Sequence, residues 1–100
     1  MKYIIENYII KYFADSNTSE EIAKALNMSN RNCSRVVKNL LGKSVCELVT
    51  QQRMHIAKSL ITKTDRQLGE IAEAVGYKTY VAFFTAFKKY YGISPNILRQ

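Results

Sequence analysis

The chain has 100 residues, of which 47% are hydrophobic, and a formal net charge of +7. A chain of this length supports one modest domain or two very small ones, and it excludes a large enzyme. The hydrophobic content excludes a disordered tail, and no apolar run approaches the ~18 to 20 residues that span a bilayer. Because the first residues also lack the pattern of a secretory signal, we expect a cytoplasmic protein that does not enter a membrane.

Residues 3–13, YIIENYIIKYF, form the first predicted helix. Apolar residues recur there at the four-residue spacing of a helix face, although the Ile and Tyr content would also suit a strand. The next predicted helix lies in residues 18–27, TSEEIAKALN, where Thr18 and Glu21 have the spacing of an N-terminal capping box. This helix should end near Asn27, because asparagine tolerates the left-handed backbone conformation.

A long helix is predicted for residues 44–61, SVCELVTQQRMHIAKSLI. Ser44 and Glu47 have the spacing of a second capping box at its start, and apolar residues follow at helical intervals. About 18 helical residues extend about 27 Å, so this helix can act as a spacer between two parts of the chain.

The sequence also contains an internal repeat. The segment EEIAKALNMS, residues 20–29, recurs as GEIAEAVGYK at residues 69–78, an offset of 49 positions. With an offset of 50, CSRVVKNLLGKS at residues 33–44 aligns with FFTAFKKYYGIS at residues 83–94. Two copies of one local pattern predict two similar structural units.

Each copy of the repeat has the pattern of a helix-turn-helix. A short first helix is followed by a tight turn, at Asn27 or Gly76, and then by a second helix that ends at a glycine. The small residues Ala23 and Ala72 stand where the second helix must cross close to the first. Helix-turn-helix units bind DNA by placing the second helix in the major groove.

A helical wheel divides each second helix into an inner and an outer face. The predicted inner residues are Cys33, Val36, Val37 and Leu40 in the first copy, and Phe83, Ala86, Phe87 and Tyr90 in the second. The predicted outer face is cationic in the first copy and carries Val81, Phe84, Thr85 and Lys88 in the second. Most aromatic rings of the second copy are therefore expected in a core, with Phe84 at the margin of the outer face.

Positive charge is segregated along the chain. Residues 22–46 carry five basic residues and no acid, and residues 74–100 carry four and no acid. Two basic blocks separated by a more acidic middle suggest two contacts with one polyanion, either a nucleic acid or a membrane surface.

The whole chain resembles the DNA-binding domain of the AraC/XylS family of bacterial transcription regulators. The segment EIAEAVGYKTYVAFFTAFKKYYGISP, residues 70–95, follows the family pattern of E-I-A, G-[FY], F, F-K-K/R, an aromatic residue and G-x-S-P. RMHIAKSLI, residues 53–61, is similar to the pattern of the family's linker helix.

The resemblance implies an all-α, seven-helix domain. It places the first helix-turn-helix subdomain at residues 1–43, the linker helix at 44–63 and the second subdomain at 64–100. It also implies that the two recognition helices enter successive major grooves of double-stranded DNA, usually in an activator that recruits RNA polymerase. The N-terminal effector and dimerisation domain usual in this family has no counterpart in the sequence. Because both units lie in one chain, we expect this chain to bind as a monomer, with a dimer possible through such an N-terminal domain.

Transferred position by position, the resemblance assigns roles to individual residues. The expected base-contacting residues are Arg31, Asn32, Ser34 and Arg35 in the first unit, and Tyr80, Val81, Phe84 and Thr85 in the second. The expected phosphate-contacting residues are Lys38, Lys43, Lys78, Lys88 and Lys89.

The two units are not expected to contribute equally to sequence selection. Arg31 and Arg35 can each form a bidentate pair with guanine, whereas no outward residue of the second unit can form a bidentate hydrogen bond to a base. The first unit should therefore select the sequence while the second mainly anchors the protein. Phe84 is expected either to contact thymine methyl groups or to pack on the flank of its own unit.

The remaining polar and sulfur-containing residues indicate no further chemistry. Cys33 and Cys46 have neither a disulfide framework nor a zinc spacing, so both are expected in the core. His55 stands alone in mid-helix and is expected at the surface without a metal. We expect no enzyme activity and no cofactor. The alternative function is a helical protein-interaction module that antagonises a regulator without binding DNA itself.

Overall fold

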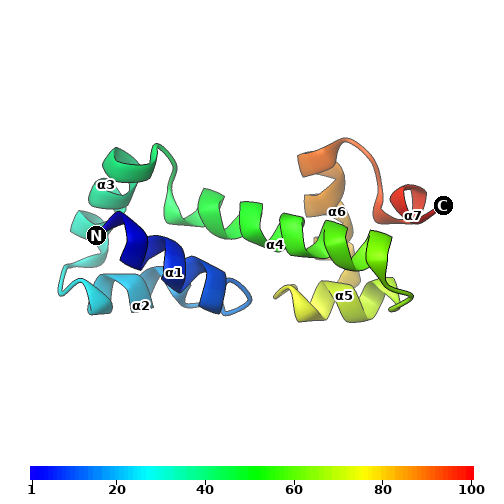
Figure 1. The fold of residues 1–100 in the computed structure, drawn as a ribbon, viewed down its shortest axis with the longest axis horizontal. Helices are drawn as coiled ribbons and strands as arrows, with labels where there is room; N and C mark the ends of the chain where they lie inside the picture. Colours follow the sequence, from blue (N-terminus) through cyan, green and yellow to red (C-terminus); the bar gives the residue numbers. More distant parts are fainter. The chain divides into compact units, whose positions relative to one another are not determined.

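The computed structural model describes all 100 residues, and these form seven α-helices and no strand (Figure 1). The helices are α1 Lys2–Tyr12, α2 Thr18–Ala25, α3 Asn30–Leu41, α4 Val45–Lys63, α5 Leu68–Ala74, α6 Tyr80–Tyr91 and α7 Pro95–Arg99. The prediction of an all-α, seven-helix fold is confirmed, and the first segment is a helix rather than a strand.

The chain forms two compact units, Met1–Gln52 and Arg53–Gln100. The boundary falls within α4, so each unit contains part of that helix. The first unit is built by α1 to α3 with the start of α4, and the second by the end of α4 with α5 to α7.

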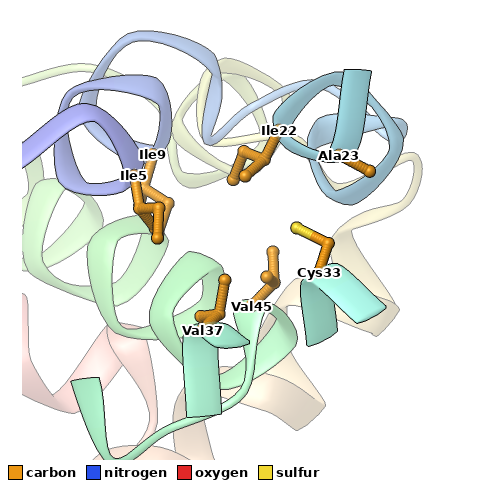
Figure 2. Packing of buried hydrophobic residues seen from close by; sticks show 7 residues of the cluster. All are labelled: Ile5, Ile9, Ile22, Ala23, Cys33, Val37 and Val45. Atoms are coloured by element: carbon orange, nitrogen blue, oxygen red, sulfur yellow. The ribbon is translucent and has the colours of Figure 1, made fainter. Parts of the chain in front are cut away.

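The core of the first unit is formed by apolar side chains from each of its helices (Figure 2). They are Ile5, Ile9, Ile22, Ala23, Cys33, Val37 and Val45, and none is more than 5% exposed. In Figure 2 the side chains of Ile5 and Ile9 on α1 face those of Val37 on α3 and Val45 on α4. Full burial of one large aliphatic side chain contributes about 1.5–3 kcal/mol, so this cluster holds α2 and α3 in place.

The core of the second unit contains large aromatic rings. Phe83 and Phe87 are 0% exposed, and their ring centroids lie 5.6 Å apart. The other buried apolar residues of this unit include Met54, Ala57, Ile61, Ile71, Ala72 and Val75. The rings exclude water from a unit of fewer than fifty residues, which has little other apolar volume.

The predicted inner face of α3 and α6 is wrong at one position in each helix. Leu40 is 45% exposed and Tyr90 is 46% exposed, whereas Leu41 and Tyr91 are partly buried. Tyr91 stacks on Phe87 with the ring centroids 4.8 Å apart. The reason is the rotation around the helix axis. A residue four positions after the last buried one is rotated about 40° from it, and a residue three positions after it about 60°. The fourth residue therefore lies nearer to the buried face.

The two helix-turn-helix turns have the same hydrogen bonds. Asn27 has a φ of 55° and Gly76 a φ of 103°, both in the left-handed region. The N–H of the following residue donates to the carbonyl of Ala23 or Ala72, over 2.9 Å and 3.0 Å respectively. This is the Schellman end of a helix, and it gives both copies of the repeat the same turn.

The capping predictions have different outcomes. At α4, the Ser44 N–H donates to Glu47 Oε1 and the Glu47 N–H donates to Ser44 Oγ, both over 3.1 Å, so this box is confirmed. The predicted Thr18 cap is wrong, because Asn17 is the N-cap residue of α2. The Thr18 hydroxyl is buried and donates to the carbonyls of Tyr12 and Asp15 instead, which ties α2 to the end of α1.

Candidate DNA-binding surface

The outer face of α3 carries four of the predicted base-contacting residues. Ser29 caps the helix by accepting a hydrogen bond from the N–H of Asn32 over 3.2 Å. Arg31, Ser34 and Arg35 are exposed and Asn32 is half-buried. Spacings of three and four residues place them on neighbouring positions of the helix surface.

Two of these side chains bond to one another. Arg35 Nη2 donates to Asn32 Oδ1 over 2.7 Å. Ser29, Arg31, Asn32 and Arg35 together line one shallow depression. The depression is cationic and rich in hydrogen-bond donors, which suits the phosphates and the guanine acceptors of DNA.

The two predicted phosphate-contacting lysines of the first unit have partners within the protein. Lys38 Nζ lies 3.7 Å from Glu47 Oε1, and Lys43 Nζ donates to Gln51 Oε1 over 3.1 Å. Hydrogen bonds from the Ser44 backbone and hydroxyl, together with the Lys38 charge, lower the pKa of Glu47. Glu47 therefore places a fixed negative charge beside Lys38.

The outer face of α6 is mostly uncharged. Val81 is 73% exposed and Thr85 is exposed, while Tyr80 and Phe84 are half-buried. The Tyr80 and Phe84 ring centroids lie 6.1 Å apart. The Tyr80 hydroxyl donates to Asn96 Oδ1 over 2.9 Å. This hydrogen bond links the Tyr80 ring on α6 to α7.

Three exposed lysines accompany α6. Lys78 precedes the helix, and Lys88 and Lys89 lie in its last turn. None of the three forms an ion pair within the protein. They are therefore free to neutralise phosphate charge.

Two cysteines and one histidine complete the predictions made from sequence. Cys33 is buried, and burial raises the pKa of its thiol. Cys46 is exposed, so the prediction that both cysteines lie in the core is wrong: its neighbour Val45 takes the buried position at the start of α4. His55 is exposed as expected.

Sequence reasoning missed Asn96 and Glu47 as neighbours of the predicted DNA-contacting residues. Asn96 bonds to a residue sixteen positions away, which no local pattern indicates. Glu47 could have been found, because the confirmed capping box places its carboxylate at the start of α4, directly after the basic end of α3.

Residues 22–100 match the family described as "Helix-turn-helix domain", which is the AraC/XylS type of this motif. The chain belongs to the AraC/XylS family of transcription regulators. The AraC-type domain is the part of these regulators that binds DNA, so this chain is a DNA-binding domain. The match favours DNA binding over the alternative of an interaction module that has lost its DNA surface.

Individual relatives have the same fold over nearly the whole chain. The C-terminal domain of AraT, a response regulator from Geobacillus stearothermophilus, is 43% identical with a TM-score of 0.91, covering 98% of this chain and 82% of that one. The DNA-binding domain of AdpA, solved in complex with a target DNA, is 23% identical and shares the AraC-type fold with a TM-score of 0.88, covering 98% of this chain and 88% of that one.

The relatives known from sequence are longer proteins. The bifunctional transcriptional activator and DNA repair enzyme AdaA of Bacillus subtilis is 34% identical over 97 residues, which are 97% of this chain and 46% of AdaA. The chain spans less than half the length of the curated relatives it matches. None of the seven helices is long and apolar enough to cross a membrane.

Proposed function

We propose that this AraC-type domain selects a specific DNA sequence mainly through α3 and anchors itself mainly through α6. In this proposal each recognition helix enters a major groove, and the two grooves are successive ones on the same duplex. A major groove of B-DNA admits one α-helix, and it recurs about every 34 Å. The helix-turn-helix subdomains are residues 1–43 and 64–100, and residues 44–63 are the linker.

The observation that carries the proposal is the contrast between the outer faces of α3 and α6. Arg31 and Arg35 are exposed on α3, and each has the fork of donors that matches the two acceptors of guanine. The corresponding side chains on α6 are Val81 and Thr85, which offer apolar contact to a thymine methyl group and one hydroxyl. The first unit therefore has the chemistry for strong discrimination and the second for weak discrimination.

Phosphate contacts complete the interface in this proposal. Lys78, Lys88 and Lys89 neutralise backbone charge around α6, and Lys38 and Lys43 do so around the end of α3. These contacts add affinity without sequence preference. The N-terminal residues Arg31 and Asn32 of α3 lie where a recognition helix usually approaches the base edges.

The wider role that we propose for the domain is supported by its relatives. The name of AdaA includes transcriptional activation, which supports recruitment of RNA polymerase by a regulator that contains this domain. We place the domain with bacterial DNA in the nucleoid, where it binds as a monomer and catalyses no reaction. A further domain of the whole regulator would supply any effector response or dimerisation.

The test begins with selection of a preferred duplex from a random library, followed by fluorescence anisotropy on all single-base variants of that duplex. Arg35→Ala should lose discrimination worth about 1–3 kcal/mol at one base pair. Phe84→Ser should lose less and should keep the preferred sequence. Asn39→Ala changes an exposed α3 residue outside the proposed contacts and is the matched control.

Two results would contradict the proposed division between the units. One is an equal relaxation of specificity by Phe84→Ser and by Arg35→Ala. The other is failure of the unmodified protein to prefer any duplex from the library, which would favour the interaction-module alternative.

A further inference from the structure

The side chains of Asn32 and Arg35 form a pair on the outer surface of α3. Arg35 Nη2 donates to Asn32 Oδ1 over 2.7 Å, and the two residues are one helical turn apart. Arg35 is exposed whereas Asn32 is half-buried. The arginine therefore reaches outward while the asparagine lies closer to the helix.

The backbone of Asn32 is held in place at the start of α3. Its N–H donates to Ser29 Oγ over 3.2 Å, which caps the helix. Ser29, Asn32 and Arg35 line the same depression, together with Arg31. The backbone of Asn32 thus bonds to the helix cap, and its side chain bonds to the guanidinium group.

We propose that Asn32 is a positioning residue that orients the Arg35 guanidinium toward a base, rather than a residue that contacts a base itself. This inference rests on the proposed function, in which Arg35 selects a base pair. It changes the role that the family resemblance implies for Asn32.

The donor and acceptor chemistry supports this assignment. A guanidinium group has five N–H donors in a rigid fork, so one bond to Asn32 leaves enough donors for the O6 and N7 acceptors of guanine. An asparagine that pairs with adenine uses its oxygen and its NH₂ group together. Arg35 already occupies one of the two lone pairs of Asn32 Oδ1, so only the other is left for adenine. Fixing a flexible arginine before binding also lowers the conformational entropy that it loses on binding.

The second unit shows that the helix cap does not require the pair. Thr79 accepts a hydrogen bond from the N–H of Ala82 over 3.1 Å, as Ser29 does from Asn32. The repeat places Ala82 and Thr85 at the positions of Asn32 and Arg35, and these side chains cannot form such a bond. The cap is therefore common to both units, whereas the pair occurs only in the unit that we propose selects the sequence.

A double-mutant cycle tests the inference, using the single-base panel of the selected duplex with the unmodified protein, Asn32→Ala, Arg35→Ala and the double variant. Asn32→Ala should weaken discrimination at the same base pair as Arg35→Ala does, by about 2- to 10-fold, the contribution of one hydrogen bond. It should have no further effect in the Arg35→Ala background. Asn32→Asp keeps an oxygen acceptor for Arg35, so it should restore discrimination at that base pair while lowering affinity for all duplexes. Asn39→Ala is again the control.

Each other outcome contradicts a distinct part of the argument. If Asn32→Ala changed the preference at a different base pair, or if its effect added to that of Arg35→Ala, Asn32 would contact a base directly. If Asn32→Ala instead lowered the affinity for all duplexes equally, Asn32 would have a purely structural role. If Arg35→Ala itself caused no loss at any single base pair, the proposed function would fail as well, so the two failures can be distinguished.

Discussion

At the scale of single residues, the repeat places two lysines in equivalent positions with different surroundings. Lys38 on α3 lies 3.7 Å from the carboxylate of Glu47, whereas Lys88 on α6 has no acidic partner. A carboxylate beside a lysine repels the same phosphate that the lysine attracts. Equivalent residues of the two units should therefore contribute unequally to DNA affinity.

Lys88→Ala should weaken binding to all duplexes more than Lys38→Ala does. The slope of log affinity against log salt should become shallower by about 0.9 for Lys88→Ala, the value for one released counterion. Anisotropy titrations at several salt concentrations measure both quantities. A Lys88→Ala protein that lost its preference for one duplex while keeping its non-specific affinity would show that Lys88 does not contact phosphate.

At the scale of helices, the first helix of each helix-turn-helix unit has no side-chain hydrogen bond at its N-cap. At α5 the N-cap residue is Gln67, which makes no side-chain cap bond, and Gly69 follows inside the helix. Glycine in a helix interior is less favourable than alanine because it loses more backbone freedom on folding. The α5 helix therefore has a weaker start than α3, α4 and α7, which have side-chain caps.

Gly69→Ala should stabilise the protein by about 0.5–1 kcal/mol. A Cβ atom at this position would meet no atom within 4 Å, and the backbone is outside the left-handed region, so the substitution causes no strain. Thermal unfolding followed by circular dichroism measures the change. Gly92→Ala is the contrasting variant: that glycine has a φ of 80°, so the same substitution there should destabilise.

The capping box of α4 predicts a dependence of stability on pH. The pKa of Glu47 is lower in the folded protein than its ordinary value of 4.5, so its ionised form is stabilised by folding. This stabilisation is present above the unfolded pKa and is lost as the pH falls through the folded one. Glu47→Gln keeps an oxygen acceptor for the Ser44 N–H but does not titrate.

The unmodified protein should therefore lose more thermal stability between pH 7 and pH 3 than the Glu47→Gln variant does. The other carboxylates are present in both proteins, so the difference between the two melting curves isolates Glu47. Parallel losses in the two proteins would show that this box does not contribute to acid sensitivity.

At the scale of the whole molecule, the end of the chain is tied to residues more than thirty positions earlier. The Arg99 guanidinium of α7 donates to the carbonyls of Ile61, Thr64 and Arg66. These carbonyls belong to the end of α4 and to the connection toward α5. One side chain thus satisfies backbone groups that a helix end leaves unpaired.

Arg99→Ala should destabilise the protein by about 1.5–3 kcal/mol, the range for hydrogen bonds that involve a charged group. Arg99→Lys keeps the charge but lacks the planar fork of donors that reaches three carbonyls. It should therefore recover only part of the lost stability. Chemical denaturation measures the free energy of unfolding of both variants, with Lys89→Ala as an exposed basic control. Full recovery by lysine would mean that charge rather than geometry stabilises this contact.

The sequence by itself determined the features that depend on residues within about four positions of one another. The all-α class follows from helical periodicity, and the similarity of the two units follows from the repeat. The turns at Asn27 and Gly76 and the Ser44–Glu47 box were predictable for the same reason, because each is closed by local backbone or side-chain hydrogen bonds. The family patterns in residues 53–61 and 70–95 identified DNA binding.

Only the tertiary structure decided the features that depend on what each helix packs against. Periodicity indicates which side of a helix is apolar, and rotation around the helix brings the fourth residue nearer to the buried face than the third. The packed structure shows the outcome, in which Leu41 and Tyr91 are partly buried and Leu40 and Tyr90 are exposed. The Thr18 hydroxyl bonds to the preceding helix instead of capping its own, because its burial places it against those carbonyls. The Tyr80–Asn96 and Arg99 contacts join residues far apart in the chain, and local sequence patterns carry no information about distances between helices that folding brings together.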